Sequence, residues 1–332
     1  MTSNPADSGQ PLLVLDTASL YYRSYFALPS SMTAPDGHPH NAIRGLFTTI
    51  TRLVERFNAR GVVAAWDEDW RPSWRVDLIP SYKAHRVVDS ESLAHELERG
   101  AGDVTAVELE PETLGPQIGA IAAILDAWGL PRLGAVGFEA DDIAATVAKI
   151  ADDPVIVVTG DRDLIQLVRP GVQVLLTAKG GMENWPLLDS AGVVNKYGLP
   201  PERYVEFAVL RGDASDGLPG VKGVGEKTAL ALIQAYPSLA ELITAAESPP
   251  LVKPLTPRIA AAISNSQDYL SAAHTVTTLR DDVALASNEW SPPSSPSDPD
   301  ALAQILAEWG VERFVHEAMS AVNVSRSGPS PR

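Results

Sequence analysis

The clearest structural signal in this chain is the stretch Val155-Ile156-Val157-Val158-Thr159-Gly160-Asp161-Arg162-Asp163. An unbroken apolar and β-branched run of this kind is typical of a strand that is buried on both faces of a parallel sheet. Comparable runs at residues 12–15, 62–66 and 172–176 alternate with helical patterns at 43–57, 114–128 and 140–150. The alternation predicts an α/β fold with a mostly parallel, twisted sheet flanked by helices.

Acidic residues gather directly after these strand runs. Because ligands of parallel sheets bind beyond the carboxyl ends of the strands, we expect the acids to converge. Converging carboxylates raise one another's pKa unless cations hold them, and oxygen ligands without Cys or paired His favour Mg²⁺ or Mn²⁺. The pattern predicts a site for two metal ions that cuts phosphodiesters. Its candidate metal ligands are Asp16, Asp67, Glu139, Asp141, Asp142, Asp161, Asp163, Asp213 and Asp216.

The clustering of the acids is a stronger signal than any one of them. A single Asp after a strand is common in α/β proteins, so Asp16 or Asp67 alone means little. Three short clusters, Glu-x-Asp-Asp at 139–142, Asp-x-Asp at 161–163 and Asp-x-x-Asp at 213–216, are far harder to assemble by accident.

Composition narrows the class of protein. The 332 residues include 45% hydrophobic residues and seven Trp, which suffices for two domains or for one domain with an appendage. The absence of Cys excludes disulfides, thiolate nucleophiles and Cys-zinc sites, and is consistent with a cytoplasmic location. No signal peptide is visible, and no apolar run approaches the roughly 18 residues that span a bilayer. The net charge of −16 argues against a general nucleic-acid binder, although a local basic stripe could coexist with it.

The pattern along the chain divides it into five parts. Residues 1–11 and 324–332 are small and polar and are predicted to be disordered. An α/β block at 12–185 is followed by a helical part at 186–289. The next part, 290–323, consists of a Ser/Pro-rich connector and an amphipathic helix at 300–322. Residues 88–113 carry eight acids against Arg99, and we interpret them as a solvated acidic loop with a short helix.

A glycine-rich hairpin lies between predicted helices at 202–211 and 226–235. Its glycines would let a phosphate approach the backbone, and amides at the start of the second helix would point at the anion. This is a helix–hairpin–helix pattern for gripping a nucleic-acid backbone, and the spacing excludes a Walker A loop. A plain turn between packed helices is the alternative. The candidate DNA contacts here are Gly220, Val221, Lys222, Gly223, Val224, Gly225 and Lys227.

Basic and aromatic residues provide weaker signals. Lys83 and Arg86 are three residues apart, so on a helix they would share a face and could reach one phosphate, although ordinary surface charge is the alternative. The aromatic residues between 21 and 26 could stack on an unpaired base, but aromatic side chains after a core strand more often belong to the core.

Taken together, these motifs resemble the 5′-nuclease (flap endonuclease) family, which includes the N-terminal 5′→3′ exonuclease domain of bacterial DNA polymerase I. The resemblance covers residues 12–285, and the chain looks like a free-standing member. It implies a PIN-like domain, a helical arch at about 71–113 and a helix–hairpin–helix subdomain at 186–289. The matching stretches are 13–16, 41–45, 65–67, 82–86, 137–142, 159–164 and 212–229.

The resemblance also implies roles for individual residues. Asp16, Asp67, Glu139 and Asp141 would hold the first ion, and the remaining five acids the second, some through water. Lys83, Arg86 and Arg23 would contact phosphates near the cut, with Arg75 and Tyr82 as further DNA contacts. In relatives the hairpin can also bind K⁺. Gly217 stands where many relatives carry Asn, and the acidic stretch at 88–113 is longer than the usual connector.

The resulting hypothesis is a metal-dependent 5′→3′ exonuclease or structure-specific flap endonuclease that acts in DNA replication and repair. Lys83, Arg86 and Asp141 are its predicted catalytic residues, two Mg²⁺ ions its cofactors and Mn²⁺ a possible substitute. Its predicted partner is DNA with 5′ flaps, nicks or free 5′ ends, bound by a monomer that has no membrane contact and whose protein partners are unknown. The alternatives are a DNA-junction-binding protein without catalysis and a PIN-type ribonuclease, which the hairpin disfavours.

Overall fold

A six-stranded sheet forms the centre of the molecule. The computed structural model describes residues 9–87, 111–152, 154–248, 250–290 and 294–327. The strands lie in the order β3-β2-β1-β4-β5-β6, and all pairs are parallel except β5 with β6. The predicted mostly parallel sheet is therefore confirmed. The strands are β1 (Leu12–Asp16), β2 (Gly61–Ala65), β3 (Arg132–Leu133), β4 (Val155–Thr159), β5 (Val172–Leu176) and β6 (Leu187–Leu188).

Alternate residues of the strands point to opposite faces of the sheet and belong to two hydrophobic cores, one on each face. Leu12 and Val14 belong to the core under α6 (Ala140–Ile150), whereas Leu13 and Leu15 belong to the core under the helices of the opposite face. Those helices are α1 (Thr17–Ala27), α2 (Asn41–Phe57) and α5 (Gly115–Trp128). Burial on both faces explains the unbroken apolar runs in the sequence.

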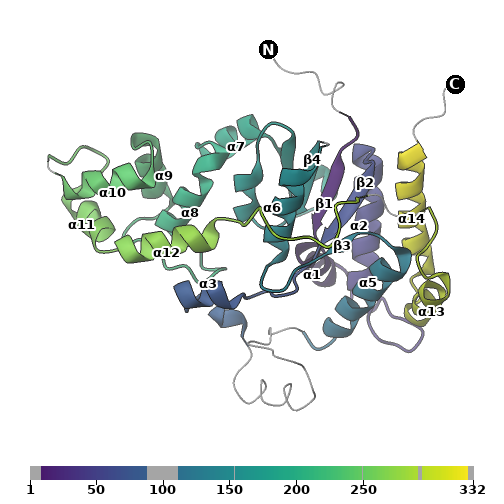
Figure 1. Cartoon of the computed structure of the whole chain (residues 1–332). Helices are drawn as coiled ribbons and strands as arrows, with labels where there is room; N and C mark the ends of the chain where they lie inside the picture. The colour runs from purple at the N-terminus through teal and green to yellow at the C-terminus, as the bar shows by residue number, and fades with distance from the viewer. Residues whose placement is uncertain (1–8, 88–110, 153, 249, 291–293, 328–332) are drawn as a thin grey trace.

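Six helices gather on one side of the sheet, where Figure 1 shows them in teal and green. The core on the α6 face continues into them without a break. Strand β6 lies beyond the predicted boundary at residues 185 and 186, so the sheet extends further than the sequence pattern indicated. The helices are α7 (Ser190–Tyr197), α8 (Tyr204–Arg211), α9 (Glu226–Ala235), α10 (Leu239–Glu247), α11 (Pro257–Ser264) and α12 (Gln267–Thr277).

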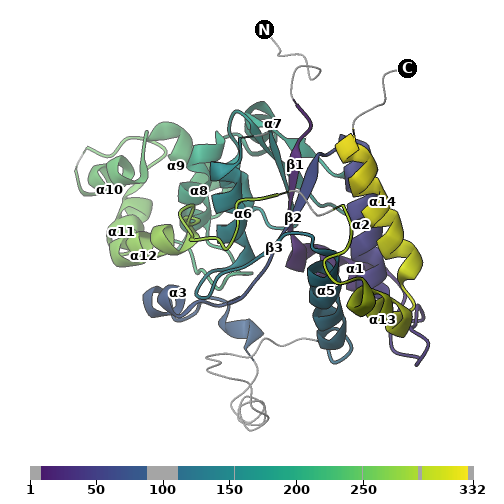
Figure 2. The same ribbon diagram turned by 45° about the vertical axis from the view of Figure 1, so that its right-hand side comes forward.

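The C-terminal part corrects a prediction. In place of one helix at 300–322, the chain forms α13 (Pro299–Trp309) and α14 (Glu312–Ser327). Gly310 ends α13 with a positive φ of 61°, a conformation that breaks the helix. Helix α14 packs along α2, which Figure 2 shows in yellow and purple, and α13 packs along α5. Helix α14 also includes residues 324–327, which were predicted to belong to a disordered tail.

Of the segment at about 71–113 that was predicted to form a helical arch, the structure describes residues 71–87 and 111–113. Helix α3 (Ser73–Leu78) and the 3₁₀ turn at Ala84–Arg86 lead into residues 88–110. Residues 88–110 of the acidic stretch at 88–113 fall outside the described residues, as do residues 1–8 and 328–332 of the two segments that were predicted to be disordered. Within the described part, no single helix is long and apolar enough to cross a bilayer; α9 and α10 meet those criteria only as a pair, which is bent by 92°.

Candidate functional site

The predicted convergence of acids is found at the carboxyl ends of the strands. Asp16 ends β1 and caps α1, since its Oδ1 accepts a hydrogen bond from Ser19 N at 3.1 Å. Asp67 follows β2 and accepts from Ala140 N at 2.8 Å, which ties it to the start of α6. A pocket of about 850 Å³ opens there. The predicted metal ligands that line it are Asp16, Asp67, Glu139, Asp141, Asp161 and Asp213.

Several of these carboxylates are buried close to one another, and neighbouring cations and hydrogen bonds offset their negative charge only in part. Burial raises the pKa of Asp16 to about 7, with Asp67 and Asp161 adding to the rise against the hydrogen bond from Thr159. Burial, followed by the charges of Asp16 and Asp161, likewise holds the pKa of Asp141 well above its usual range. Such a cluster binds protons or cations readily, because either one removes the repulsion.

The three basic side chains that were predicted to contact phosphates line the same pocket. Lys83 and Arg86 come from the turn after α3, and Arg23 from α1. Burial alone would lower the pKa of Lys83, but the charge of Glu139 raises it well above its usual range, so Lys83 stays protonated. Arg86 donates to Ser215 O at 3.0 Å and lies 3.9 Å from Asp216 Oδ1. The site therefore combines carboxylates with fixed cations.

Glu139 is held on both of its oxygens. Tyr82 donates its hydroxyl to Oε1 at 2.8 Å, and Arg75 Nη1 lies 3.1 Å from the same oxygen. The Lys83 ammonium donates to Oε2. Arg75 and Tyr82 are only 1% and 4% exposed. Both were predicted to contact DNA, and both are instead buried supports of Glu139, which corrects that prediction.

Asp142 also departs from its predicted role as a metal ligand. It is fully buried and turned away from the pocket, where its Oδ1 accepts from Arg75 Nη2 at 2.7 Å and from Arg280 N at 2.9 Å. Its Oδ2 accepts from Glu139 N at 3.3 Å and completes a capping box at the start of α6. The Glu-x-x-Asp spacing was therefore a helix-capping signal at this residue.

Of the remaining acids, Asp213 lines the pocket, whereas Asp163 and Asp216 are buried and are not among its lining residues. Burial and the charge of Asp161 hold the pKa of Asp163 well above its usual range, and burial raises that of Asp216 to about 6. Asp216 Oδ1 is buried without a hydrogen-bond partner. Asp213 is already paired with Arg211 Nη2 at 2.9 Å.

The donor set fits divalent cations that retain water. An orphaned carboxylate oxygen and a cluster of oxygen donors suit Mg²⁺ or Mn²⁺, which usually keep several water ligands. No three Asp, Glu or His side chains among the described residues already surround one point as a metal cage would.

This charge balance leads to a prediction about stability. Acids whose folded pKa is raised above the unfolded value stabilise the fold while protonated, and that contribution is lost as pH rises through the folded pKa. For Asp16 and Asp216 the loss falls between about pH 4 and 7. In EDTA we expect the melting temperature at about pH 8 to lie several degrees below that at about pH 5.5, and Mg²⁺ to raise it more at the higher pH. Calorimetry at both pH values checks this; an equal Mg²⁺ effect at both would contradict it.

The predicted hairpin presents only part of its surface outward. Val221 and Val224 are each 3% exposed, and the amides of Gly220 and Val221 donate to Tyr269 Oη and Leu210 O. These positions are therefore structural, contrary to the prediction. The outward-facing candidates are Lys222, Gly223, Gly225 and Lys227.

Several basic residues near these surfaces were missed in the sequence. Arg258, on the first turn of α11, is exposed, and its Nη2 would lie 3.7 Å from a Cβ on Gly223. Arg162 and Lys179 line the acidic pocket. Lys179 could have been found because it follows β5 as Asp161 follows β4. Arg258 lies too far along the chain from the hairpin for any local pattern to link them.

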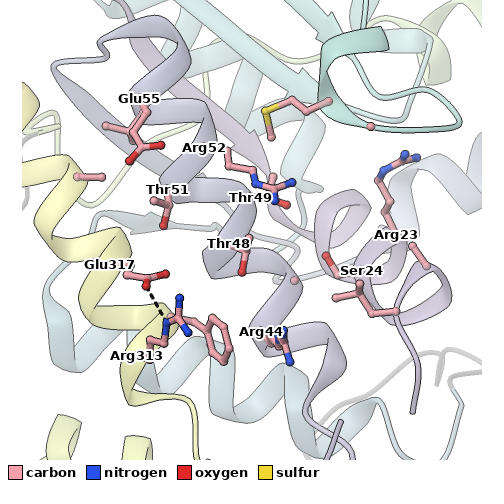
Figure 3. Close-up of a pocket in the computed structure, with 18 of the residues that line it drawn as sticks. Arg23, Ser24, Arg44, Thr48, Thr49, Thr51, Arg52, Glu55, Arg313 and Glu317 are labelled. Atoms are coloured by element: carbon pink, nitrogen blue, oxygen red, sulfur yellow. Dashed lines mark hydrogen bonds and ion pairs between the residues drawn. The ribbon is translucent and has the colours of Figure 1, made fainter. Parts of the chain in front are cut away.

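A second groove of about 990 Å³ adjoins the acidic pocket, and Arg23 and Gly180 line both. Figure 3 shows it between α1, α2 and α14, with Arg44, Arg52 and Arg313 around it. Arg23 donates to Gly180 O at 3.1 Å and its guanidinium lies over the Trp185 ring at 5.0 Å. Glu55 and Glu317 line the groove as well, and Glu317 pairs with Arg313, so Arg23, Arg44 and Arg52 are its remaining basic residues.

Two family models match consecutive parts of the chain. The 5′-3′ exonuclease N-terminal resolvase-like domain matches residues 11–198, and the 5′-3′ exonuclease C-terminal SAM fold matches residues 199–298. Helices α13 and α14 lie beyond both.

Similar proteins agree with these models. A 5′-3′ exonuclease of Streptomyces coelicolor is 46% identical over 302 residues, which cover 90% of this chain and 96% of that protein. DNA polymerase I of Mycobacterium bovis is 38% identical over 242 residues, covering 71% of this chain and 24% of the polymerase. The bacteriophage T5 flap endonuclease, solved with DNA and metal ions, matches with a TM-score of 0.59 at 17% identity over 95% of this chain and 99% of that one.

Proposed function

Because the chain belongs to the 5′-3′ exonuclease family, we propose that it uses divalent metal ions to hydrolyse DNA phosphodiesters at 5′ flaps, nicks and free 5′ ends. The chain is a nuclease and hence a hydrolase. The observation that supports the proposal best is one pocket in which acids from three strand ends and α6 face Lys83 and Arg86. Phosphoryl transfer needs anions to hold metal and cations directed at the phosphate.

The acids divide into two proposed ion sites. Asp16, Asp67 and Asp141 would hold one ion, and Asp161 with Asp163, Asp213 and Asp216 a second, partly through water. Bound Mg²⁺ or Mn²⁺ supplies Lewis acidity and lowers the pKa of water. We assign Glu139 a different task, because both of its oxygens already accept from Tyr82 and Lys83: it orients the Lys83 ammonium.

The cations act on the phosphate itself. Lys83 lines the pocket, and its ion pair with Glu139 keeps its ammonium group protonated. The ammonium has three N–H donors, so it can also donate a hydrogen bond to a phosphate oxygen. The Arg86 side chain is 35% exposed and is tethered by one bond to Ser215 O, so the rest of its guanidinium is free to bind a phosphate. Both would stabilise charge that develops on the phosphate during cleavage.

Two surfaces flank the pocket and would bind two arms of DNA. On one side lie the exposed residues at the start of α9 with Lys222, Lys227 and Arg258, where we also propose a K⁺ ion. On the other side lies the groove between α2 and α14 (Figure 3). An enzyme with duplex surfaces on both sides of its cutting site suits a branched or nicked substrate better than a plain single strand. We further propose that the protein acts as a monomer in the cytoplasm, in DNA replication and repair.

A cleavage assay tests the proposal directly. A 5′-labelled flap duplex, a nicked duplex and a single-stranded RNA are each incubated with Mg²⁺, Mn²⁺ or EDTA. We expect metal-dependent release of a fragment cut near the flap junction, cleavage of the nicked duplex from its 5′ end, and no cleavage of the RNA.

The same assay separates the rival functions. Flap binding without cleavage in either metal would point to a junction-binding protein that lacks catalysis. Faster cleavage of the RNA than of the flap would point to a ribonuclease. Either result would overturn the proposal.

A further inference from the structure

Two backbone turns that are far apart in the sequence interlock beside the acidic pocket. The first is the turn at residues 79–87, which carries Lys83 and Arg86. The second is the turn between Asp213 and Leu218, which closes by a pair of backbone hydrogen bonds of 3.0 and 2.8 Å between these two residues. It lies between α8 and the hairpin at 220–225, so it joins the proposed DNA-binding surface to the proposed cutting site.

Three hydrogen bonds join the two turns, all of them to successive carbonyls of the second turn. Lys83 N donates to Asp216 O at 3.0 Å, Ser81 Oγ to Gly217 O at 2.8 Å, and Arg86 Nη2 to Ser215 O at 3.0 Å. The backbone of Lys83 is held at a positive φ of 48°, which is uncommon and costly for a residue with a side chain. The bond from its amide to Asp216 O stabilises this conformation.

Gly217 is what allows the turns to lie so close. A Cβ at this position would lie 2.9 Å from the carbonyl carbon of Ser81, nearer still to its oxygen, and 3.4 Å from Lys83 N. All three are backbone atoms, so none can swing aside as a flexible side chain would. Any other residue at 217 would have to push the turn that carries Lys83 away from the carboxylates.

We propose that Gly217 is a positioning residue for the nuclease reaction: its lack of a side chain sets the place of Lys83 and Arg86 relative to the acidic pocket. The inference rests on the proposed function, because it assumes that these two side chains act on the phosphate. It assigns a task to the glycine of the Asp213–Leu218 turn, which none of the proposed ion sites or DNA contacts uses.

The test is a set of matched glycine variants assayed on the flap duplex. Gly217→Ala should lower kcat on the order of 10-fold or more, because small displacements of catalytic groups have large effects, while KM and DNA affinity change less than about threefold. Gly171→Ala is the control: Gly171 has a similar φ of 83° and no atom within 4 Å of an added Cβ. It should share the backbone strain and any loss of stability but keep the wild-type kcat.

The Gly217→Asn variant distinguishes the effect of backbone strain at positive φ from the effect of a collision between the added Cβ and the Ser81 backbone. Asn tolerates positive φ better than Ala but carries the same Cβ. A kcat as low as that of Gly217→Ala would support the collision with Ser81, and a wild-type kcat would overturn the proposal. If the Gly217 variants fail to fold, Ser81→Ala removes one of the bonds between the turns, and we expect a few-fold fall in kcat with unchanged KM; no change would count against the coupling. A wild-type enzyme that cleaves no substrate would instead refute the proposed function.

Discussion

Replacing Asp141 by Asn is expected to lower the rate of flap cleavage on the order of 10³-fold or more, an effect equal to about 4 kcal/mol of transition-state stabilisation. Asp141 lies in the first turn of α6 and lines the acidic pocket. Among the described residues its carboxylate makes no hydrogen bond or ion pair, unlike that of Glu139. Its charge is therefore available for a cation, and nothing in the fold depends on it.

The same substitution should leave the protein folded and able to bind DNA. The pKa of Asp141 is raised by burial and by the charges of Asp16 and Asp161, so a neutral amide of the same size removes repulsion. In EDTA the melting temperature should stay the same or rise, and the rise that Mg²⁺ causes should shrink. Binding to a flap duplex, measured by fluorescence anisotropy, should be unchanged or tighter, because one negative charge beside the DNA is lost.

Asp281→Asn serves as the control. Asp281 is half exposed and pairs with Lys149 at the surface, far from the strand ends. Its loss should change neither cleavage nor the Mg²⁺-dependent melting shift. An Asp141→Asn enzyme that loses DNA binding together with cleavage would contradict the assignment of Asp141 to metal binding.

The sequence predicted the sheet and most of the pocket for a physical reason. Strands buried on both faces must be apolar throughout, so their ends are visible as the points where Asp16, Asp67 and Asp161 appear. Parallel topology then requires those ends to lie at one edge of the sheet. This prediction requires no knowledge of tertiary contacts. It requires only the positions of the apolar runs in the sequence and the rule that the carboxyl ends of parallel strands lie at the same edge of the sheet.

The same reasoning failed where a side chain's partner lies far along the chain. Asp142 was predicted to bind metal and Arg75 to bind DNA, yet these residues, 67 positions apart in sequence, pair with each other in the interior. The break at Gly310 was missed because the apolar spacing continues across it, and only the positive φ reveals the turn. For Gly217 the sequence showed only a departure from the family pattern, and no local pattern could have predicted that the Ser81 backbone lies against it.

For Arg75 the sequence predicted a DNA contact, whereas the structure shows a buried ion-pairing residue. Replacing Arg75 by Met should therefore produce the largest loss of stability among the variants considered. Its guanidinium is 1% exposed and holds Asp142 at 2.7 Å, Glu139 at 3.1 Å and Val276 O, on α12, at 3.1 Å. Removing one partner of a buried pair leaves the others as unpaired charges, which typically costs about 3–5 kcal/mol. For a chain of this size we expect the melting temperature to fall by roughly 6 °C or more.

The companion variant is Arg132→Met. Arg132 also makes a two-pronged pair, with Asp126 at 2.8 Å on both contacts, but this pair lies at the surface. Exposed pairs contribute about 1 kcal/mol or less, so its melting temperature should fall by no more than a few degrees. If Arg75 bound DNA, as its place in the sequence indicated, Arg75→Met would weaken DNA binding with little change in melting temperature. Burial predicts the reverse: below its lowered melting temperature the folded variant should bind the flap duplex normally, while cleavage falls because Glu139 loses one of the donors that hold it in place to orient Lys83.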